Sequence, residues 1–288
     1  MACFWLGAIT AATSSACGER PSAVFTQLIE ARRLTAELLV HFTKAADAAN
    51  RAVMADTDEA SIAFAHEATQ ETKAVDGELS KLQTFVRDLK YSDELTLLAE
   101  FRATFAKYQT LDREILGLAV ENTNLKAQRL SFGPADQAAQ AFRDSLDALL
   151  RAVPEKDTWQ VRALAVTAVL AVREIQVLQA PHIAASVDAA MTEIEHKIAT
   201  SEANAHSALK DLASIAKPEF QPAIDAANAA LSRFMAINGR LVALSRRNSN
   251  VRSLALSLGQ KRTLTAACEA SLRALTDRLA KRDFSATR

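Results

Sequence analysis

The amino-acid sequence predicts an all-α protein that consists of two tandem antiparallel four-helix bundles. The chain of 288 residues contains only 7 Gly and 6 Pro, and so few turn-forming residues favour long helices. Apolar residues recur at spacings of three and four over most of the chain, and no run shows the alternation typical of a strand. The second half also repeats the first after a shift of 126 positions, which indicates an internal duplication.

Four helices are predicted in the first copy. Asp56, with Glu59 three residues later, forms a capping box between the first and second helices. Ser92, followed by two acidic residues, is expected to cap the third, and Gly133 and Pro134 are expected to stop it sharply. The four predicted helices run from 22 to about 56, then to about 89, from 92 to 132, and from there to about 152.

The second copy repeats this order. Asp157 with Gln160 is expected to cap its first helix, and Pro181 is expected to break that helix. Pro218 stands where a first-turn proline is favoured, and Gly259 is expected to stop the third helix. The four predicted helices cover about 157–181, 183–216, 218–258 and 261–282.

The duplication is clearest near the end of the third helix of each copy. There, Leu118, Asn122, Asn124 and Leu130 align without gaps with Leu244, Asn248, Asn250 and Leu256. Four helices are the number that lets amphipathic stripes close around one core. We therefore expect each copy to enclose its own core, with bundle limits at 22–153 and 157–284.

The first seventeen residues, MACFWLGAITAATSSAC, carry no charge. One interpretation is a buried first helix. The other is an export signal within residues 1–20, with Cys17 as a site of lipidation, although no Lys or Arg provides the usual positive start. The export hypothesis predicts a periplasmic or otherwise extracytoplasmic protein that is anchored through a lipid if Cys17 is modified. No other uncharged run approaches the ~18–20 residues of a membrane span.

Polar side chains interrupt the apolar stripe of the predicted third helices. Asn122 takes a position that large apolar residues occupy one and two heptads earlier, and Lys126 and Arg129 follow it; Asn248 and Arg252 repeat the pattern. A buried amide or cation needs a partner. Three interpretations are open: a hydrogen-bond network that fixes helix register, exposure of the helix end, or a pocket in which these five residues bind a carboxylate or similar anion.

Residues 105–149, FAKYQTLDREILGLAVENTNLKAQRLSFGPADQAAQAFRDSLDAL, resemble the third and fourth helices of the four-helix-bundle ligand-binding domain of bacterial methyl-accepting chemotaxis receptors. The likeness covers about 22–152 in helix lengths, and the second copy shares it more faintly. The resemblance implies an extracytoplasmic sensor that binds a small molecule and transmits a helix shift. We recognise no second span and no signalling hairpin in the sequence, so the likeness is to a doubled sensory module without its transducer.

Composition and motifs argue against several classes of function. Lys plus Arg and Asp plus Glu both number 34, so no excess of positive charge favours nucleic acid. Glu193 and His196 form a Glu-x-x-His pair, which di-iron bundles use twice, but no second pair occurs, and a solvated helix face is the better interpretation. Cys268 is expected to be a small buried apolar residue. No nucleotide-binding loop or nucleophile motif is recognisable, so we expect neither an enzyme nor a cofactor or metal site.

These observations predict a non-catalytic recognition module, similar to the sensor part of a chemoreceptor. The expected partners are a small organic acid or anion, a membrane receptor or kinase that supplies the transducer, and a second copy of the chain in a homodimer. Contact with a membrane is expected only through an N-terminal anchor. The alternative is a structural or scaffold helical-bundle protein that binds no small molecule, and a metal-dependent bundle enzyme is remote.

Overall fold

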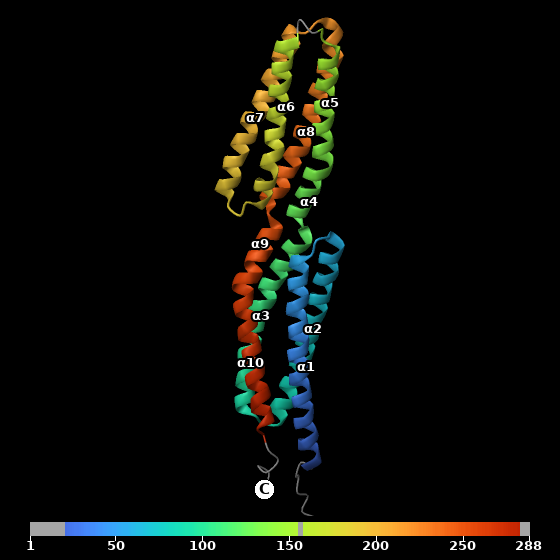
Figure 1. The fold of residues 1–288 in the computed structure, drawn as a ribbon. Coiled ribbons are helices and arrows are strands. Elements are labelled where there is room, and N and C mark those ends of the chain that lie inside the picture. Colours follow the sequence, from blue (N-terminus) through green and yellow to red (C-terminus); the bar gives the residue numbers. More distant parts are fainter. Residues whose placement is uncertain (1–20, 155–157, 283–288) are drawn as a thin grey trace, which may run out of the picture.

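The computed structural model describes residues 21–154 and 158–282, which form a long rod of helices without strands (Figure 1). The predicted all-α fold class is therefore confirmed. In chain order the elements are α1 (Pro21–Met54), α2 (Asp58–Asp88), α3 (Ser92–Glu121), α4 (Thr123–Leu130), the π-helical turn η1 (Ser131–Ala135), α5 (Asp136–Ala152), α6 (Thr158–Ala184), α7 (Asp188–Ile215), the 3-10 turn η3 (Pro218–Phe220), α8 (Gln221–Arg247), α9 (Ser249–Leu256), the π-helical turn η4 (Ser257–Lys261) and α10 (Arg262–Ala280).

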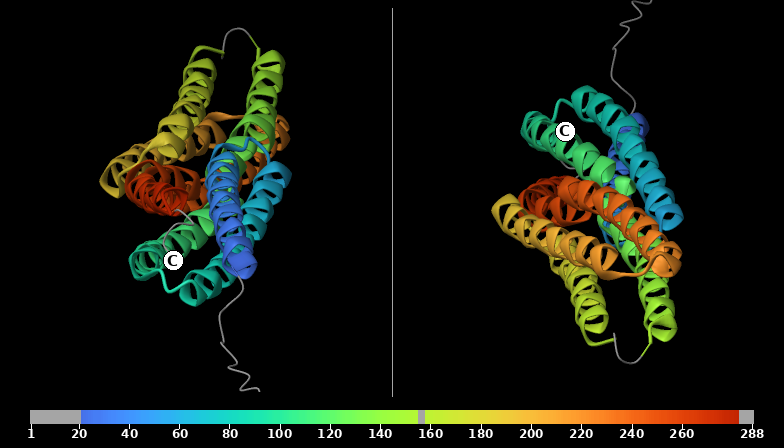
Figure 2. Two further views of the ribbon diagram at one scale, coloured as in Figure 1. Left: turned by 90° about the horizontal axis from the view of Figure 1, so that it is seen from below. Right: turned by 90° about the horizontal axis from the view of Figure 1, so that it is seen from above.

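The rod contains two bundles stacked end to end, and they meet at a waist formed by α4 and α9 (Figure 1). The lower bundle packs α1, α2, α3 and α10 around one core, and the upper bundle packs α5, α6, α7 and α8 around another. Views along the rod show the last helix, α10, beside the first part of the chain (Figure 2). Each bundle thus holds three helices of one sequence copy and the fourth helix of the other. The limits 22–153 and 157–284 describe the copies and not the packed cores.

Aromatic and aliphatic side chains fill the lower core. Phe42 of α1 packs edge-on against three rings of α3, at centroid distances of 5.1 Å to Tyr108, 6.0 Å to Phe105 and 6.3 Å to Phe101. Edge-to-face packing is favourable because the positive ring edge meets the negative ring face. The exchanged helix α10 completes this core with the buried residues Cys268, Leu272, Leu275 and Leu279, which confirms the expectation for Cys268.

The exchange of fourth helices arises because the long helices do not end at Gly133 and Gly259. Neither glycine has a positive φ, the conformation that ends a helix at glycine. Instead the backbone forms η1 and η4 and continues directly into α5 and α10. The wider i→i+5 spacing of a π-turn accommodates Pro134, which would clash with the carbonyl four residues earlier in an α-helix. The predicted stops are therefore wrong, and each fourth helix runs past the waist into the other bundle.

Other predicted helix limits differ from the structure by a few residues. The side chain of Thr57 caps α2, so the cap lies one residue beyond Asp56. Ser92 is the first residue of α3 and makes no side-chain cap. Pro181 does not break α6, which continues to Ala184. The sharp interruptions occur instead at the two asparagines of the waist.

A buried ion pair joins α10 to the lower bundle. Lys261 Nζ lies 2.7 Å from Asp112 Oδ1, and the two side chains are only 2% and 5% exposed. Burial raises the pKa of Asp112 and lowers the pKa of Lys261, while the opposite charge of the partner counteracts both effects. The duplication places Asn238 and Ala135 at the equivalent positions of the upper bundle. The ion pair is therefore specific to the lower bundle.

The far end of α10 is held by two further arginine contacts. Arg282 forms two 2.8 Å hydrogen bonds with Glu94, whose side chain is fully buried. Arg32 donates hydrogen bonds to the backbone carbonyls of Leu279, Ala280 and Arg282, at and just after the end of α10. Cations near a helix C-terminus stabilise its unpaired carbonyls. Charged contacts thus anchor both ends of the exchanged helix.

Two predictions concern segments outside the described residues. These are the export signal within 1–20, with lipidation at Cys17, and the helix cap at Asp157. In the described part of the chain, no helix combines the length and apolar character that crossing a bilayer requires.

Candidate functional site

The repeated polar segments meet at the waist, where two long helical segments cross. One segment consists of α3, α4, η1 and α5, and the other of α8, α9, η4 and α10; we call each of them a helical rod. Asn122 and Asn248 adopt left-handed backbone conformations, with φ of 48° and 54°, and each interrupts its rod before a short helix, α4 or α9. Asn tolerates this conformation better than most residues because its short polar side chain can bond locally. The residues that follow in one copy contact the same residues in the other. The waist therefore has approximate twofold symmetry within a single chain.

The two short helices cap each other. The Thr123 N–H donates to Ser249 Oγ at 3.1 Å, and the Ser249 N–H donates to Thr123 Oγ1 at 3.0 Å. The Asn124 N–H likewise donates to Asn250 Oδ1 at 3.1 Å, and the reverse bond measures 3.2 Å. The first N–H groups of a helix have no partner within it, and a side-chain oxygen just before the helix usually accepts from them. Here the oxygen comes from the other copy, as in the self-complementary contact of a twofold dimer.

Side-chain amides complete this network. Asn124 Nδ2 donates to Asn248 Oδ1 at 2.9 Å, and Asn250 Nδ2 donates to Asn122 Oδ1 at 2.8 Å. The remaining amide groups of Asn122 and Asn248 donate to backbone carbonyls of the α1–α2 and α6–α7 connections, at 3.4 and 2.9 Å. Both asparagines are almost fully buried. Their polar atoms are thus satisfied within the protein, which is the arrangement that the register-network hypothesis expects.

The other predicted ligand-binding residues lie around this network. Lys126 Nζ donates to the Glu121 backbone carbonyl at 2.7 Å, and Arg129 forms a 3.1 Å ion pair with Asp58. Arg252 forms no ion pair with any residue that the structure describes, and it lines an open groove between α3 and α9. The predicted set is therefore not brought together around one pocket.

The groove at Arg252, here called the arginine groove, has a volume of about 680 Å³. Three guanidinium groups, of Arg113, Arg247 and Arg252, line it together with the carboxylates of Glu114 and Glu121. Arg247 Nε donates to Glu121 at 2.6 Å and lowers the pKa of that carboxyl. Outside that pair, the two guanidinium groups of Arg113 and Arg252 outnumber the single carboxylate of Glu114, so the remaining charge in the groove is net positive. Its apolar and small lining residues are Gly117, Leu118, Ala255 and Leu256.

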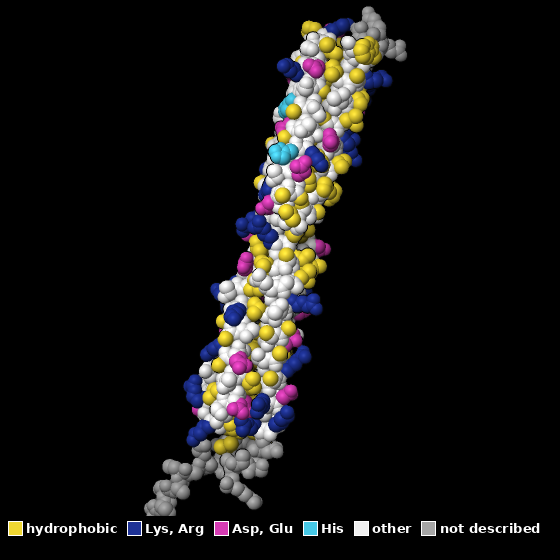
Figure 3. Space-filling view, turned by 90° about the vertical axis from the view of Figure 1, so that its left-hand side faces the viewer, with side chains coloured by type: hydrophobic (Ala, Val, Ile, Leu, Met, Phe, Trp, Pro, Cys, Tyr) yellow, Lys and Arg dark blue, Asp and Glu magenta, His cyan; other side chains and the backbone are white. Residues whose placement is uncertain are grey.

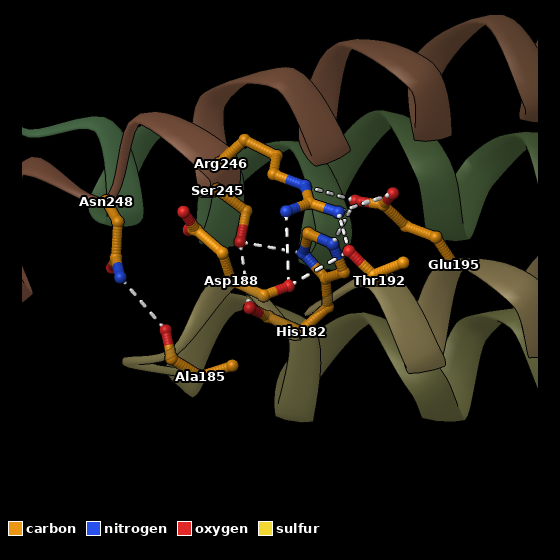
Figure 4. A network of polar contacts seen from close by, with 8 residues as sticks. All are labelled: His182, Ala185, Asp188, Thr192, Glu195, Ser245, Arg246 and Asn248. Carbon is orange, nitrogen blue, oxygen red and sulfur yellow. Dashed lines mark hydrogen bonds and ion pairs between the residues drawn. The ribbon is translucent and has the colours of Figure 1, made fainter. Parts of the chain in front are cut away.

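A second polar cluster joins α6, α7 and α8 just above the waist (Figure 4). The ring of His182 is fully buried, with Nδ1 2.8 Å from Ser245 Oγ and Nε2 2.9 Å from Glu195 Oε1. Arg246 binds both oxygens of Glu195, at 2.7 Å from Nε and 2.8 Å from Nη2. Figure 4 shows these side chains converging from three helices, close to Asn248. The cluster holds the upper bundle together at the point where α8 gives way to α9.

Ser245, His182 and Glu195 are the residue types of a hydrolase triad, but their arrangement does not fit that chemistry. A nucleophilic serine gives its proton to the histidine ring. Here the backbone carbonyl of His182 lies 2.9 Å from Ser245 Oγ and competes with the ring for the single hydroxyl proton. Ser245 is also fully buried, out of reach of a substrate. Both ring nitrogens of His182 are hydrogen-bonded within the protein, and the cluster joins three helices.

The carboxyl of Glu195 predicts a loss of stability in acid. Hydrogen bonds from Arg246 and then His182 outweigh desolvation and lower its pKa from 4.5 to about 2. Because the folded-state pKa is lower than the unfolded one, the stabilisation is fully present above about pH 4.5 and is lost as the pH falls towards 2. We expect Glu195→Gln to cost roughly 1.5–3 kcal/mol at neutral pH, and this difference from wild type should shrink towards pH 2 in urea unfolding. Glu193→Gln, on the exposed face of α7, is the control and should follow wild type; the same pH profile in both variants would contradict the assignment.

The His182 cluster could not be recognised from the sequence, because its members lie on three helices and are far apart in the chain. One signal was available: His182 follows Ile175 and Gln179 on α6 at helical spacings of four and three, so it lies on the same buried face of the helix. The Glu193 and His196 side chains are exposed, as expected from a solvated face. In the described part of the chain, no group of three or more His, Cys, Asp or Glu residues is placed to hold a metal ion.

Comparison with known proteins adds no assignment to this geometry. No protein-family model, no curated protein and no solved structure matches this chain.

Proposed function

We propose that this chain is a non-catalytic recognition module, of the kind found in the sensor part of chemoreceptors, and that it binds a small organic anion in the arginine groove. The observation that carries the proposal is that Arg113 and Arg252 face the groove without an ion pair to any described residue. Guanidinium groups bind carboxylates through two parallel hydrogen bonds. A volume of about 680 Å³ also lies within the usual range for small-molecule sites, roughly 300–1,000 Å³.

The position of the groove supports a signalling role. Its walls come from α3 of one rod and from α8 and α9 of the other, on either side of the turn at Asn248. A ligand that contacts both rods changes the free energy of their crossing, and a ligand shifts a conformational equilibrium by as much as its affinity differs between the states. An extracytoplasmic location, and a receptor or kinase that reads the shift, belong to the same proposal.

The alternative is a structural helical-bundle protein without a ligand. One observation favours it: the repeated amides of Asn122, Asn124, Asn248 and Asn250 are hydrogen-bonded within the protein and need no ligand to satisfy them. Under this alternative, the exposed arginines of the groove are ordinary surface charges.

A thermal-shift screen with dicarboxylates, amino acids and inorganic anions separates the two. A ligand that binds only the folded state at about 100 times its Kd adds roughly 2.7 kcal/mol of stability, so we expect at least one organic anion to raise the melting temperature. Arg113→Ala and Arg252→Ala should each reduce this shift, and the double variant should abolish it.

The matched control is Arg240→Ala. Arg240 is exposed on α8 and corresponds in the duplication to Glu114 of the groove, so the variant removes an arginine from the equivalent place outside the groove. It should keep the full ligand response. A screen in which no compound shifts wild type would favour the structural alternative. A shift that survives in the Arg113→Ala/Arg252→Ala variant would place the ligand elsewhere.

A further inference from the structure

An apolar row on α6 faces away from the upper core. It contains Trp159, Val166, Leu170 and Val177, which are 72%, 48%, 61% and 61% exposed. The spacings of seven, four and seven put these residues on one face of the helix, as in the seam of a coiled coil. We call this row the α6 stripe. Figure 3 shows hydrophobic side chains gathered along one edge of the upper half of the rod.

The duplication provides an internal comparison for the α6 stripe. The equivalent residues on α1, in the same order, are Arg33, Val40, Lys44 and Arg51. Arg33 pairs with acidic side chains of its own helix, and Arg51 pairs with Glu67 at 2.6 Å. A helix in this place of the bundle is therefore stable with a charged outer face. Single exposed apolar residues need no explanation, but a continuous row that folding does not require indicates an interaction surface.

We propose that the α6 stripe is the contact surface of a homodimer in which α6 packs antiparallel against α6 of a second copy. With the twofold axis at the level of Ala168, Trp159 lies opposite Val177 of the partner subunit, and Val166 lies opposite Leu170 of the partner subunit. The stripe is thus complementary to itself, as an isologous interface requires. The proposal is independent of the arginine groove, which lies at the waist.

Charge favours this orientation over a parallel one. Arg173 is exposed between Leu170 and Val177 on the same face. A parallel pair would bring Arg173 of both subunits to the same level of the seam, and like charges at an interface oppose association. In the antiparallel pair Arg173 faces Ala163 of the partner subunit, which leaves room for the guanidinium group to reach solvent.

The size of the stripe predicts a weak dimer. The four residues span about 27 Å of helix at 1.5 Å per residue, on a face roughly 10 Å wide. Stable interfaces bury at least about 1,200 Å² in total, so the stripe needs additional area from side chains that flank α6. We therefore expect a dissociation constant in the micromolar range.

Sedimentation equilibrium across the micromolar range tests the proposal on the full chain. Wild type should pass from monomer to dimer. Leu170→Lys/Val177→Arg, which introduces the residues found at the equivalent positions of α1, should weaken the dimer at least tenfold while circular dichroism shows unchanged helix content. Val40→Lys, on the outer face of α1, is the matched control and should dimerise as wild type does.

Three results would overturn the proposal. The first is a wild type that stays monomeric throughout, including one that instead binds vesicles of neutral phospholipid. The second is a double variant that dimerises like wild type. Should the double variant fail to fold, disulfide trapping decides: chains with Trp159→Cys and chains with Val177→Cys, each with Cys3 and Cys17 changed to Ser, should form a disulfide dimer only when mixed. A disulfide within either chain type alone, or none in the mixture, is the third.

Discussion

Lys261→Met is expected to destabilise the protein by about 3–5 kcal/mol, because it leaves the Asp112 carboxylate buried without a cation. The Asp112 side chain is 5% exposed, and its ion pair is the 2.7 Å contact with Lys261. Methionine keeps the length of the lysine side chain, so the loss reports on charge and not on volume. Urea unfolding followed by circular dichroism gives the free energy, and domains of ordinary stability, roughly 5–15 kcal/mol, make a change of this size plain.

The control for this prediction removes both charges. In Asp112→Leu/Lys261→Met no charge stays buried, and replacing a buried ion pair by apolar residues of similar shape is often neutral or stabilising by about 1–4 kcal/mol. We expect the double variant to be at least as stable as wild type. A Lys261→Met variant within about 0.5 kcal/mol of wild type, the range of ordinary surface substitutions, would show that the ion pair does not behave as a buried one.

The same ion pair bears on the choice between exchanged and unexchanged bundles. If each copy folded with its own fourth helix, Ala135 would take the place of Lys261 in the lower bundle, and Asp112 would be buried without its cation. That penalty disfavours the unexchanged arrangement. The ion pair thus costs desolvation but selects one pairing of helices, a role that buried polar groups also have in coiled coils.

The second large effect is expected at the waist. Thr123→Val removes the oxygen that accepts from the Ser249 N–H at 3.0 Å and leaves that buried donor unpaired. Ser249→Ala does the same to the Thr123 N–H. An unsatisfied buried donor costs about 1–3 kcal/mol. We expect each substitution to destabilise the protein by this amount in urea unfolding. The double variant should lose less than the sum, because both residues belong to one network.

Thr110→Val is the matched control for the waist. The Thr110 hydroxyl is exposed on α3 and donates only to a carbonyl of its own helix, so its loss should change stability by no more than about 0.5 kcal/mol. If Thr123→Val were as mild as Thr110→Val, the reciprocal caps would contribute nothing measurable. The waist would then be held by the asparagine side chains and the Arg247–Glu121 ion pair.

The fold class and the duplication were predictable from the sequence because both depend on local patterns. Spacings of three and four identified helices wherever apolar residues are buried, and the offset of 126 residues reappears as the separation of the residues that pair at the waist. The repeated Asn122 and Asn248 were recognised as polar groups that need partners. Their partners could not be predicted, since they belong to the other copy and to the backbone of distant connections.

The candidate site was predicted only in part. Arg252 lines the arginine groove as one of the residues expected to bind an anion, but Arg113 and Arg247 come from other helices and no local motif marks them. The His182 cluster was missed for the same reason. The likeness to chemoreceptor sensor domains, the export signal and lipidation at Cys17 stay predictions.

The sequence by itself determined that the chain is helical, that it is duplicated, and that each copy carries polar residues on its apolar stripe near the end of its third helix. Only the tertiary structure decided which helices share a core. Gly133 and Gly259 are of the residue type that often ends a helix in the left-handed conformation. The backbone can instead continue through a π-turn at the same place, as it does here. The choice between them depends on whether the continuing helix finds a better core beyond the waist than beside its own copy. That balance includes the Lys261–Asp112 pair and the reciprocal caps, which exist only after the two rods have met.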